Sequence, residues 1–163
     1  MSRPSQPTPY RIELLREPAG PDRGAAELVT LELRPDGDLV LSAVAVGIAV
    51  ERFEGEGRNK RTTWYTVRAR DIPRVRGALL REVFAETRPA DWFRARGIPA
   101  VAQPWHGYDV APVDDDQFLL EALRDAIGSA EWDEGEKIAF RFVRWLSSRG
   151  IEQQFREEVG EAD

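Results

Sequence analysis

The sequence predicts an α+β fold, in which an antiparallel meander sheet of three to five strands packs against C-terminal helices. Two observations carry this prediction: apolar residues alternate with polar ones early in the chain and recur at helical spacing later. The 163 residues are 42% hydrophobic and 32% charged, which suits one folded domain. We expect a disordered tail over residues 1–9, a single α+β domain over 10–156 and an acidic tail over 157–163.

Strand signals come first along the chain. Residues 10–17 predict a first strand with Ile12 and Leu14 facing the core. Residues 27–34 alternate strictly, and a Pro-Asp-Gly-Asp turn then leads into residues 39–53, which predicts a β-hairpin. The second arm is apolar on both faces, as in a central strand, and its Gly47 suggests a bulge. A further strand is expected at 61–70.

Helical spacing replaces alternation after residue 70. Asp71 is placed to cap a helix that has Pro73 in its first turn. Acidic first turns and closing glycines predict three further helices, over residues 91–96, 114–128 and about 133–148. Residues 98–112 have no regular pattern, and residues 151–156 predict a closing edge strand.

The composition excludes several kinds of functional site and indicates where in the cell the protein is expected. The chain has no cysteine, which excludes disulfides, thiolate nucleophiles and cysteine-based metal sites. No stretch approaches the ~20 apolar residues of a membrane-spanning helix, and the N-terminus lacks the apolar region of a secretory signal. Twenty-one arginines against two lysines are typical of a GC-rich bacterial genome. We expect a cytoplasmic bacterial protein with no membrane partner, no cofactor and no metal.

The solitary histidine, His106, is the candidate catalytic base, because it titrates near neutral pH and lies three residues from Asp109. No serine lies in a nucleophile elbow, and the G-x-G of residues 55–57 lacks the third glycine of a dinucleotide-binding loop. The structural alternative is that Trp105, His106 and Tyr108 fix a long loop against the core. We therefore predict that the protein is not an enzyme and has no catalytic residues.

A basic stretch with interleaved aromatics offers a nucleic-acid-binding alternative, since arginines and stacking rings on a sheet can hold single strands. In a strand, however, Trp64 and Tyr65 point to opposite faces. The residues of this alternative are Arg58, Lys60, Arg61, Trp64, Arg68 and Arg70.

Charge is unevenly distributed along the chain. The formal charge is −6, but residues 61–110 hold nine basic and five acidic residues, whereas residues 111–163 hold six and fourteen. An acidic surface can attract a basic protein partner, and tryptophans are enriched at interface anchors. Of the five tryptophans, Trp132 and Trp145 fit core packing, whereas Trp92 and Trp105 are expected to be exposed. The candidate partner-binding residues are Trp92, Trp105, His106, Tyr108, Asp114, Asp115, Asp116, Glu131, Asp133 and Glu134.

Four segments together resemble a group of small bacterial α+β proteins that includes immunity partners of polymorphic toxins. They are LVLSAVAVGIAVE (39–51), TTWYTVRARDIPRVRGALL (62–80), FLLEALRDAIGSA (118–130) and FVRWLSSRGIEQQF (142–155). The resemblance covers about two-thirds of the chain, and the insertion at 88–112 departs from it. It implies a non-enzymatic binding protein, and it transfers no site residue. Together with the acidic charge, the tryptophans and the lack of a catalytic constellation, it leads us to expect a protein-binding module, an immunity-type inhibitor of a basic protein partner.

Overall fold

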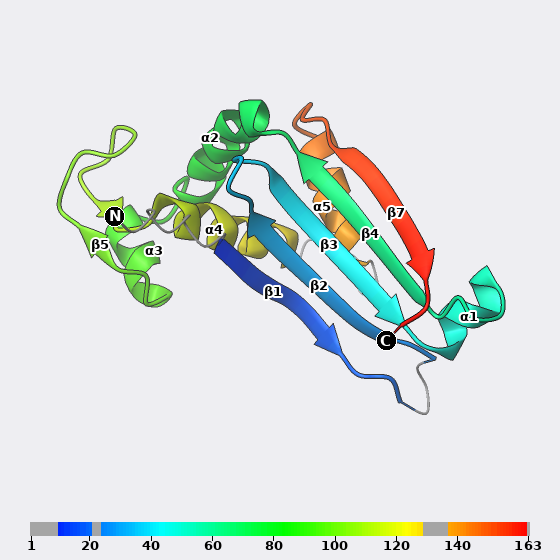
Figure 1. Cartoon of the computed structure of the whole chain (residues 1–163). Coiled ribbons are helices and arrows are strands. Elements are labelled where there is room, and N and C mark those ends of the chain that lie inside the picture. The colour runs from blue at the N-terminus through cyan, green and yellow to red at the C-terminus, as the bar shows by residue number, and fades with distance from the viewer. Residues whose placement is uncertain (1–9, 21–23, 129–136, 163) are drawn as a thin grey trace, which may run out of the picture.

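Five strands form one antiparallel sheet, and the predicted α+β class with a meander sheet is confirmed. The computed structural model describes residues 10–20, 24–128 and 137–162. The sheet order is β1-β2-β3-β4-β7; in Figure 1, α5 lies behind the sheet, α4 lies partly behind its upper left end, and α2 lies beside that end. The strands are β1 (Tyr10–Glu17), β2 (Ala26–Leu33), β3 (Leu39–Val46), β4 (Lys60–Val67) and β7 (Gln154–Gly160).

The predicted hairpin joins β2 to β3 through a tight turn. Arg34 and Asp38 close it with a hydrogen bond of 2.9 Å from the Arg34 amide to the Asp38 carbonyl oxygen. Gly37 has a φ of +92°, which glycine adopts without steric cost, and the Asp36 carboxylate accepts the Asp38 amide at 2.9 Å. The turn therefore fixes the register in which Leu31 lies opposite Leu41.

The sheet buries one face against the helices. Leu31, Leu41 and Tyr65 lie side by side on that face, and both leucines are fully buried. Burial of one such leucine stabilises the fold by roughly 1.5–3 kcal/mol. Alternate residues of β3 and β4, among them Val44 and Trp64, point to the opposite face, which no described helix covers in Figure 1. The predicted opposite orientation of Trp64 and Tyr65 is thus confirmed.

The expectation of a strand through residue 53 is wrong. Strand β3 ends at Val46, and residues Ile48–Glu54 form helix α1. Gly47 makes the change of direction: its φ is +149°, and a Cβ there would lie 2.4 Å from the carbonyl oxygen of Gly24. The chain therefore turns sharply where a bulge was expected, because two backbone segments meet too closely for any side chain.

The helices of the core are α2 (Ile72–Val83), α4 (Asp115–Gly128) and α5 (Ile138–Ser147). Helix α5 buries Phe142, Trp145 and Leu146, which confirms that Trp145 is a core residue. Its predicted residues 133–136, like Trp132, lie outside the described residues. Residues Ala69–Asp71 form a 3₁₀ turn ahead of α2, and the Asp71 side chain makes no capping bond, so that predicted cap is wrong.

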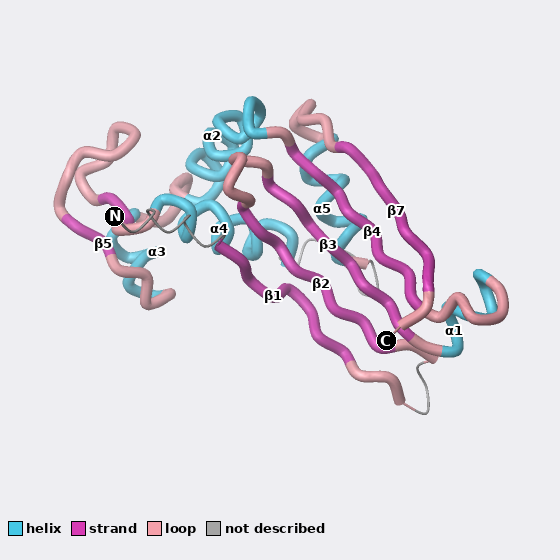
Figure 2. The backbone as a smooth tube through the Cα atoms, viewed as in Figure 1, coloured by secondary structure: helices cyan, strands magenta, loops and turns pink. Residues whose placement is uncertain are grey.

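Two further elements complete the fold. Helix α3 (Pro89–Ala95) precedes a two-stranded ribbon of β5 (Ala100–Val101) and β6 (Ala111–Pro112). Strand β7, near the C-terminus of the chain, pairs antiparallel with β4 at the edge of the main sheet (Figure 2). The expected edge strand is confirmed in kind, but it begins at Gln154 and runs to Gly160. The prediction that the chain is an acidic tail from residue 157 is therefore wrong over residues 157–160.

Candidate partner-binding site

A lobe at one end of the molecule consists of α3, the β5–β6 ribbon and the loop between its strands (Figure 1). Aromatic rings attach this lobe to the core. The Phe118 ring of α4 lies 4.9 Å edge-on from Trp105 and 5.7 Å stacked from Phe84, measured between ring centroids. Edge-to-face and offset contacts of this kind stabilise the packing beyond simple burial. The cluster comprises Phe84, Trp92, Phe93, Trp105, Tyr108 and Phe118.

Trp92 belongs to the inside of this cluster. Its side chain is only 5% exposed, and its ring lies 5.4 Å from that of Phe118. The expectation that Trp92 is an exposed anchor is therefore wrong: helix α3 turns that side chain inward, because one short helix must cover the aromatic cluster. Trp105 is half-buried, and its indole N–H donates to the Asp115 carboxylate at 3.2 Å.

The predicted Trp-His-Gly-Tyr cluster is a tight hairpin turn. Trp105 and Tyr108 exchange two backbone hydrogen bonds of 2.8 Å, and His106 and Gly107 between them have φ values of +47° and +87°. Trp105 and Tyr108 face the aromatic cluster. His106 is exposed at the tip of the turn, and the centroid of its ring lies 5.2 Å from that of the Trp105 ring. The structural alternative thus holds for Trp105 and Tyr108, and His106 is displayed to solvent.

The described residues do not place His106 in a catalytic arrangement with an acidic residue or a serine. None of their hydrogen bonds or ion pairs joins His106 to Asp109 or to a serine. Ser42 lies in the middle of β3, and Ser147 and Ser148 lie at the end of α5, away from the lobe (Figure 1). Across the same described ranges, no group of three acidic or histidine side chains is arranged to hold a metal ion.

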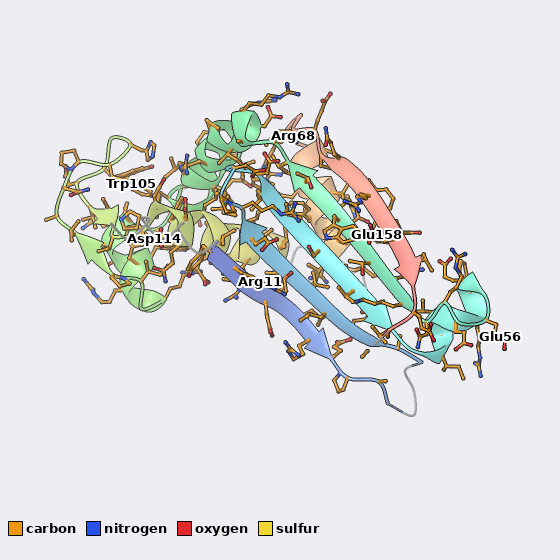
Figure 3. All side chains as sticks on the ribbon, in the orientation of Figure 1. Arg11, Glu56, Arg68, Trp105, Asp114 and Glu158 are labelled. Atoms are coloured by element: carbon orange, nitrogen blue, oxygen red, sulfur yellow. The ribbon has the colours of Figure 1, made fainter. Side chains whose placement is uncertain are left out.

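Aspartates are concentrated on one segment beside α3, while the arginines at the end of α3 pair with Asp91 and Asp125. Residues 99–117, which we call the acidic loop, contain four aspartates and no lysine or arginine. Within it, Asp115 forms an ion pair with Arg76 of α2 at 3.0 Å. The Asp114 carboxylate accepts the Asp116 amide at 3.0 Å and so caps the start of α4. Asp114 and Trp105 lie in the same part of the molecule (Figure 3).

Asp114, Asp115 and Asp116 lie close enough together for their negative charges to affect one another's ionisation. Partial desolvation, followed by the nearby charges of Asp114 and Asp115, raises the pKa of Asp116, while Arg76 acts in the opposite direction. Burial, then the charges of Glu121 and Asp114, likewise raises the pKa of the Tyr10 hydroxyl. Three aspartates, Asp114, Asp115 and Asp116, therefore lie close together at the start of α4, with Arg76 as a cationic neighbour. Glu131, Asp133 and Glu134, also predicted for this surface, lie outside the described residues.

The basic stretch is not brought together into one patch. Arg58, Lys60 and Arg61 lie at the α1 end of β4, whereas Arg68 and Arg70 follow its other end, beside α2 (Figure 3). Three of these arginines also have acidic partners: Arg61 with Glu54 at 3.7 Å, Arg68 with Asp38 at 3.4 Å and Arg70 with Asp71 at 3.9 Å. Trp64 lies between the two groups, and the guanidinium of Arg156 covers its ring at 5.0 Å.

A groove that sequence reasoning missed crosses the helix side of the sheet. It has a volume of about 670 Å³, and residues from all five strands and from the start of α5 line it. Its apolar walls include Tyr65, Phe140 and Phe155, and the last two are more than half exposed. Alternation alone could not reveal it, because these positions look like ordinary core positions until the length of α5 is known.

The comparisons with known proteins add no relative. The chain matches no family model, no curated protein and no solved structure at a significant level. In the described part of the chain, no helix combines the length and apolar character that crossing a membrane requires. The site therefore has to be judged on its own geometry.

Proposed function

We propose that this chain is a non-enzymatic protein-binding module that docks a basic protein partner, as an immunity-type inhibitor does, through the acidic loop. The observation that carries the proposal is the composition of that loop: four aspartates without a lysine or arginine, with one ion pair, Asp115 to Arg76, in the described structure. Uncompensated charge of one sign accelerates encounter with a partner of the other sign.

The surface also has the apolar contacts that an interface needs. Val101 is 42% exposed and Val113 is 65% exposed, and Val113 directly precedes Asp114. The hairpin turn presents His106 beside the half-buried Trp105. An interface commonly has an apolar centre and a polar rim, and the acidic loop provides both next to the packed aromatic cluster.

The test uses the protein products of the flanking genes, since an immunity protein is encoded beside its toxin. We expect one of them to be basic, to associate with this chain, and to arrest growth of a host that lacks it. Asp109→Asn combined with Asp114→Asn should lower the association rate constant roughly tenfold at low salt. The matched control, Glu56→Gln with Glu152→Gln, removes the same charge from exposed positions outside the acidic loop and should leave the rate unchanged.

Two results would overturn the proposal. One is the absence of association with either product at low salt. The other is an equal loss of rate in the control pair, which would mean that net charge and not this surface matters. The nucleic-acid alternative receives less support, because its basic residues are divided between the two ends of β4. The nucleic-acid alternative would be favoured instead if the chain bound oligonucleotides in a salt-dependent way and the double variant Arg68→Ala, Arg70→Ala abolished that binding.

A further inference from the structure

Strand β7 forms an edge of the sheet among the described strands. It is the outermost strand, it pairs only with β4 among the described strands, and six of its seven residues are exposed (Figure 1). Such an edge presents unpaired backbone N–H and C=O groups to a further strand. We propose that β7 pairs antiparallel with β7 of a second copy of this chain, which joins the two sheets into one.

The opposite edge of the sheet is unsuited to this role. Strand β1 has a register irregularity between Glu13 and Leu15, which interrupts a straight ladder. The Arg124 guanidinium of α4 also donates to the main-chain oxygen of Glu13 at 3.0 Å. Natural proteins protect sheet edges with bulges and covering side chains of this kind. Strand β7 has an unbroken register with β4 from residue 154 to residue 160.

The charges of β7 select one pairing register. With Glu157 opposite its own copy, Arg156 of each chain lies opposite Glu158 of the other, and Phe155 lies opposite Val159. A shift of two residues in one direction opposes Arg156 to Arg156, and a shift in the other direction opposes Glu158 to Glu158. A shift of one residue moves side chains to the wrong face. Opposite charges directly across a ladder are favourable and like charges are not.

Exposed apolar side chains mark the same edge. Phe155 is 56% exposed, and its ring lies 5.3 Å from that of Tyr65. Phe140 of α5 is 57% exposed and lines the same groove as Phe155. Pairing of the two strands would place the copies of Phe155 and Val159 against each other on this face, next to the groove. The edge therefore offers apolar burial in addition to backbone pairing.

The pairing has one unfavourable contact, which makes it testable. Glu157 opposes its own copy on the helix face, where Arg61 of the neighbouring strand lies on a diagonal position. Removal of this charge should strengthen the pairing. A seven-residue edge is small compared with the ~1,600 Å² of a typical stable interface, so we expect dissociation in the range of roughly 1–100 µM.

The first experiment measures the mass of the full chain by analytical ultracentrifugation across that concentration range. We expect a monomer–dimer equilibrium that Arg156→Glu weakens by roughly tenfold or more, because two attractive pairs become repulsive. The exchange of both charges, Arg156→Glu with Glu158→Arg, should restore dimerisation. Glu157→Gln should tighten it several-fold. Circular dichroism checks that each variant keeps the wild-type secondary structure.

The second experiment tests the register. The chain has no cysteine, so single cysteines can be introduced without interference. Residues opposite each other in an antiparallel ladder have Cα atoms about 4.5–5.5 Å apart, which a disulfide can bridge. Oxidised Glu157→Cys should therefore form a covalent dimer, whereas Val159→Cys, which lies opposite Phe155 and far from its own copy, should not.

A strictly monomeric chain at 100 µM would overturn the inference. So would a dimer that Arg156→Glu leaves intact, or equal cross-linking of the two cysteine variants. The acidic loop lies in the lobe and at the start of α4, not on β7, so these results are independent of the association measurements that test the proposed function.

Discussion

Adding one methyl group at Gly47 should strongly lower the stability of the fold. In Gly47→Ala the new Cβ would lie 2.4 Å from the Gly24 carbonyl oxygen and 2.8 Å from the Ala25 Cα, well inside the ordinary contact range of 3.4–4 Å. Both atoms belong to the backbone, so no side chain can move aside. The Gly24 oxygen also accepts a hydrogen bond from the Ala49 amide at 2.9 Å, and this bond anchors the start of α1.

The magnitude follows from three contributions. A non-glycine residue at a φ of +149° costs about 1–3 kcal/mol in backbone strain. Forcing a methyl into a filled space costs about 1–3 kcal/mol more, and loss of the Ala49 hydrogen bond adds about 1 kcal/mol. We therefore expect Gly47→Ala to lower the free energy of unfolding by roughly 3–7 kcal/mol, a large part of the ~5–15 kcal/mol that stabilises most domains.

Gly55→Ala is the matched control. Gly55 also has a positive φ, +109°, but a Cβ added there would have nothing within 4 Å, so this variant should lose only the strain contribution. Urea unfolding followed by circular dichroism and tryptophan fluorescence would give both free energies. If Gly47→Ala is no less stable than Gly55→Ala, the close approach of the two segments is not real and the reasoning fails.

Four further variants test the core, the lobe and the acidic cluster. Leu41→Ala should cost about 2–5 kcal/mol in urea unfolding, and Val44→Ala, at a half-buried position on the opposite face, about 1 kcal/mol; equal losses would contradict the packing of the helices against the Leu41 face. Trp105→Phe keeps an aromatic ring in the cluster but loses the bond to Asp115 and part of the indole packing, so a loss of at least about 1 kcal/mol is expected by the same assay. Because the pKa of Asp116 is raised, its ionisation opposes folding above that pKa. Asp116→Asn should therefore raise the urea midpoint at pH 7 and have little effect below the ordinary carboxyl pKa; a lower midpoint at pH 7 would contradict this.

The strands were more predictable than their ends. Alternation placed residues 10–17 and the hairpin correctly, because period two survives wherever one face of a sheet is buried. The residues just after Val46 are as apolar as those of β3, so composition does not mark the point where the strand ends and α1 begins. That point coincides with the close approach of Gly47 to Gly24, which is a tertiary contact. Similarly, the acidic composition of residues 157–160 resembles a tail, but pairing with β4 makes them a strand.

The candidate site was predictable only in part. The sequence placed Trp105, His106 and Tyr108 in a loop, and the structure brings them together with Asp114 and Asp115 at one end of the molecule. It could not show that Trp92 points inward, since a seven-residue helix has too few apolar positions to define a face. Nor could it show the groove, whose walls come from strands distant in sequence.

The order in which the strands join has a consequence for how the chain folds. Strands β1 to β4 pair with their neighbours along the chain, whereas β7 pairs residue 154 with residue 66, across every core helix. Local pairings form early, and contacts between distant segments wait until the intervening loop is closed. We therefore expect β4 to remain an open edge until the helices have packed, so that the final step of folding is the arrival of the C-terminal strand.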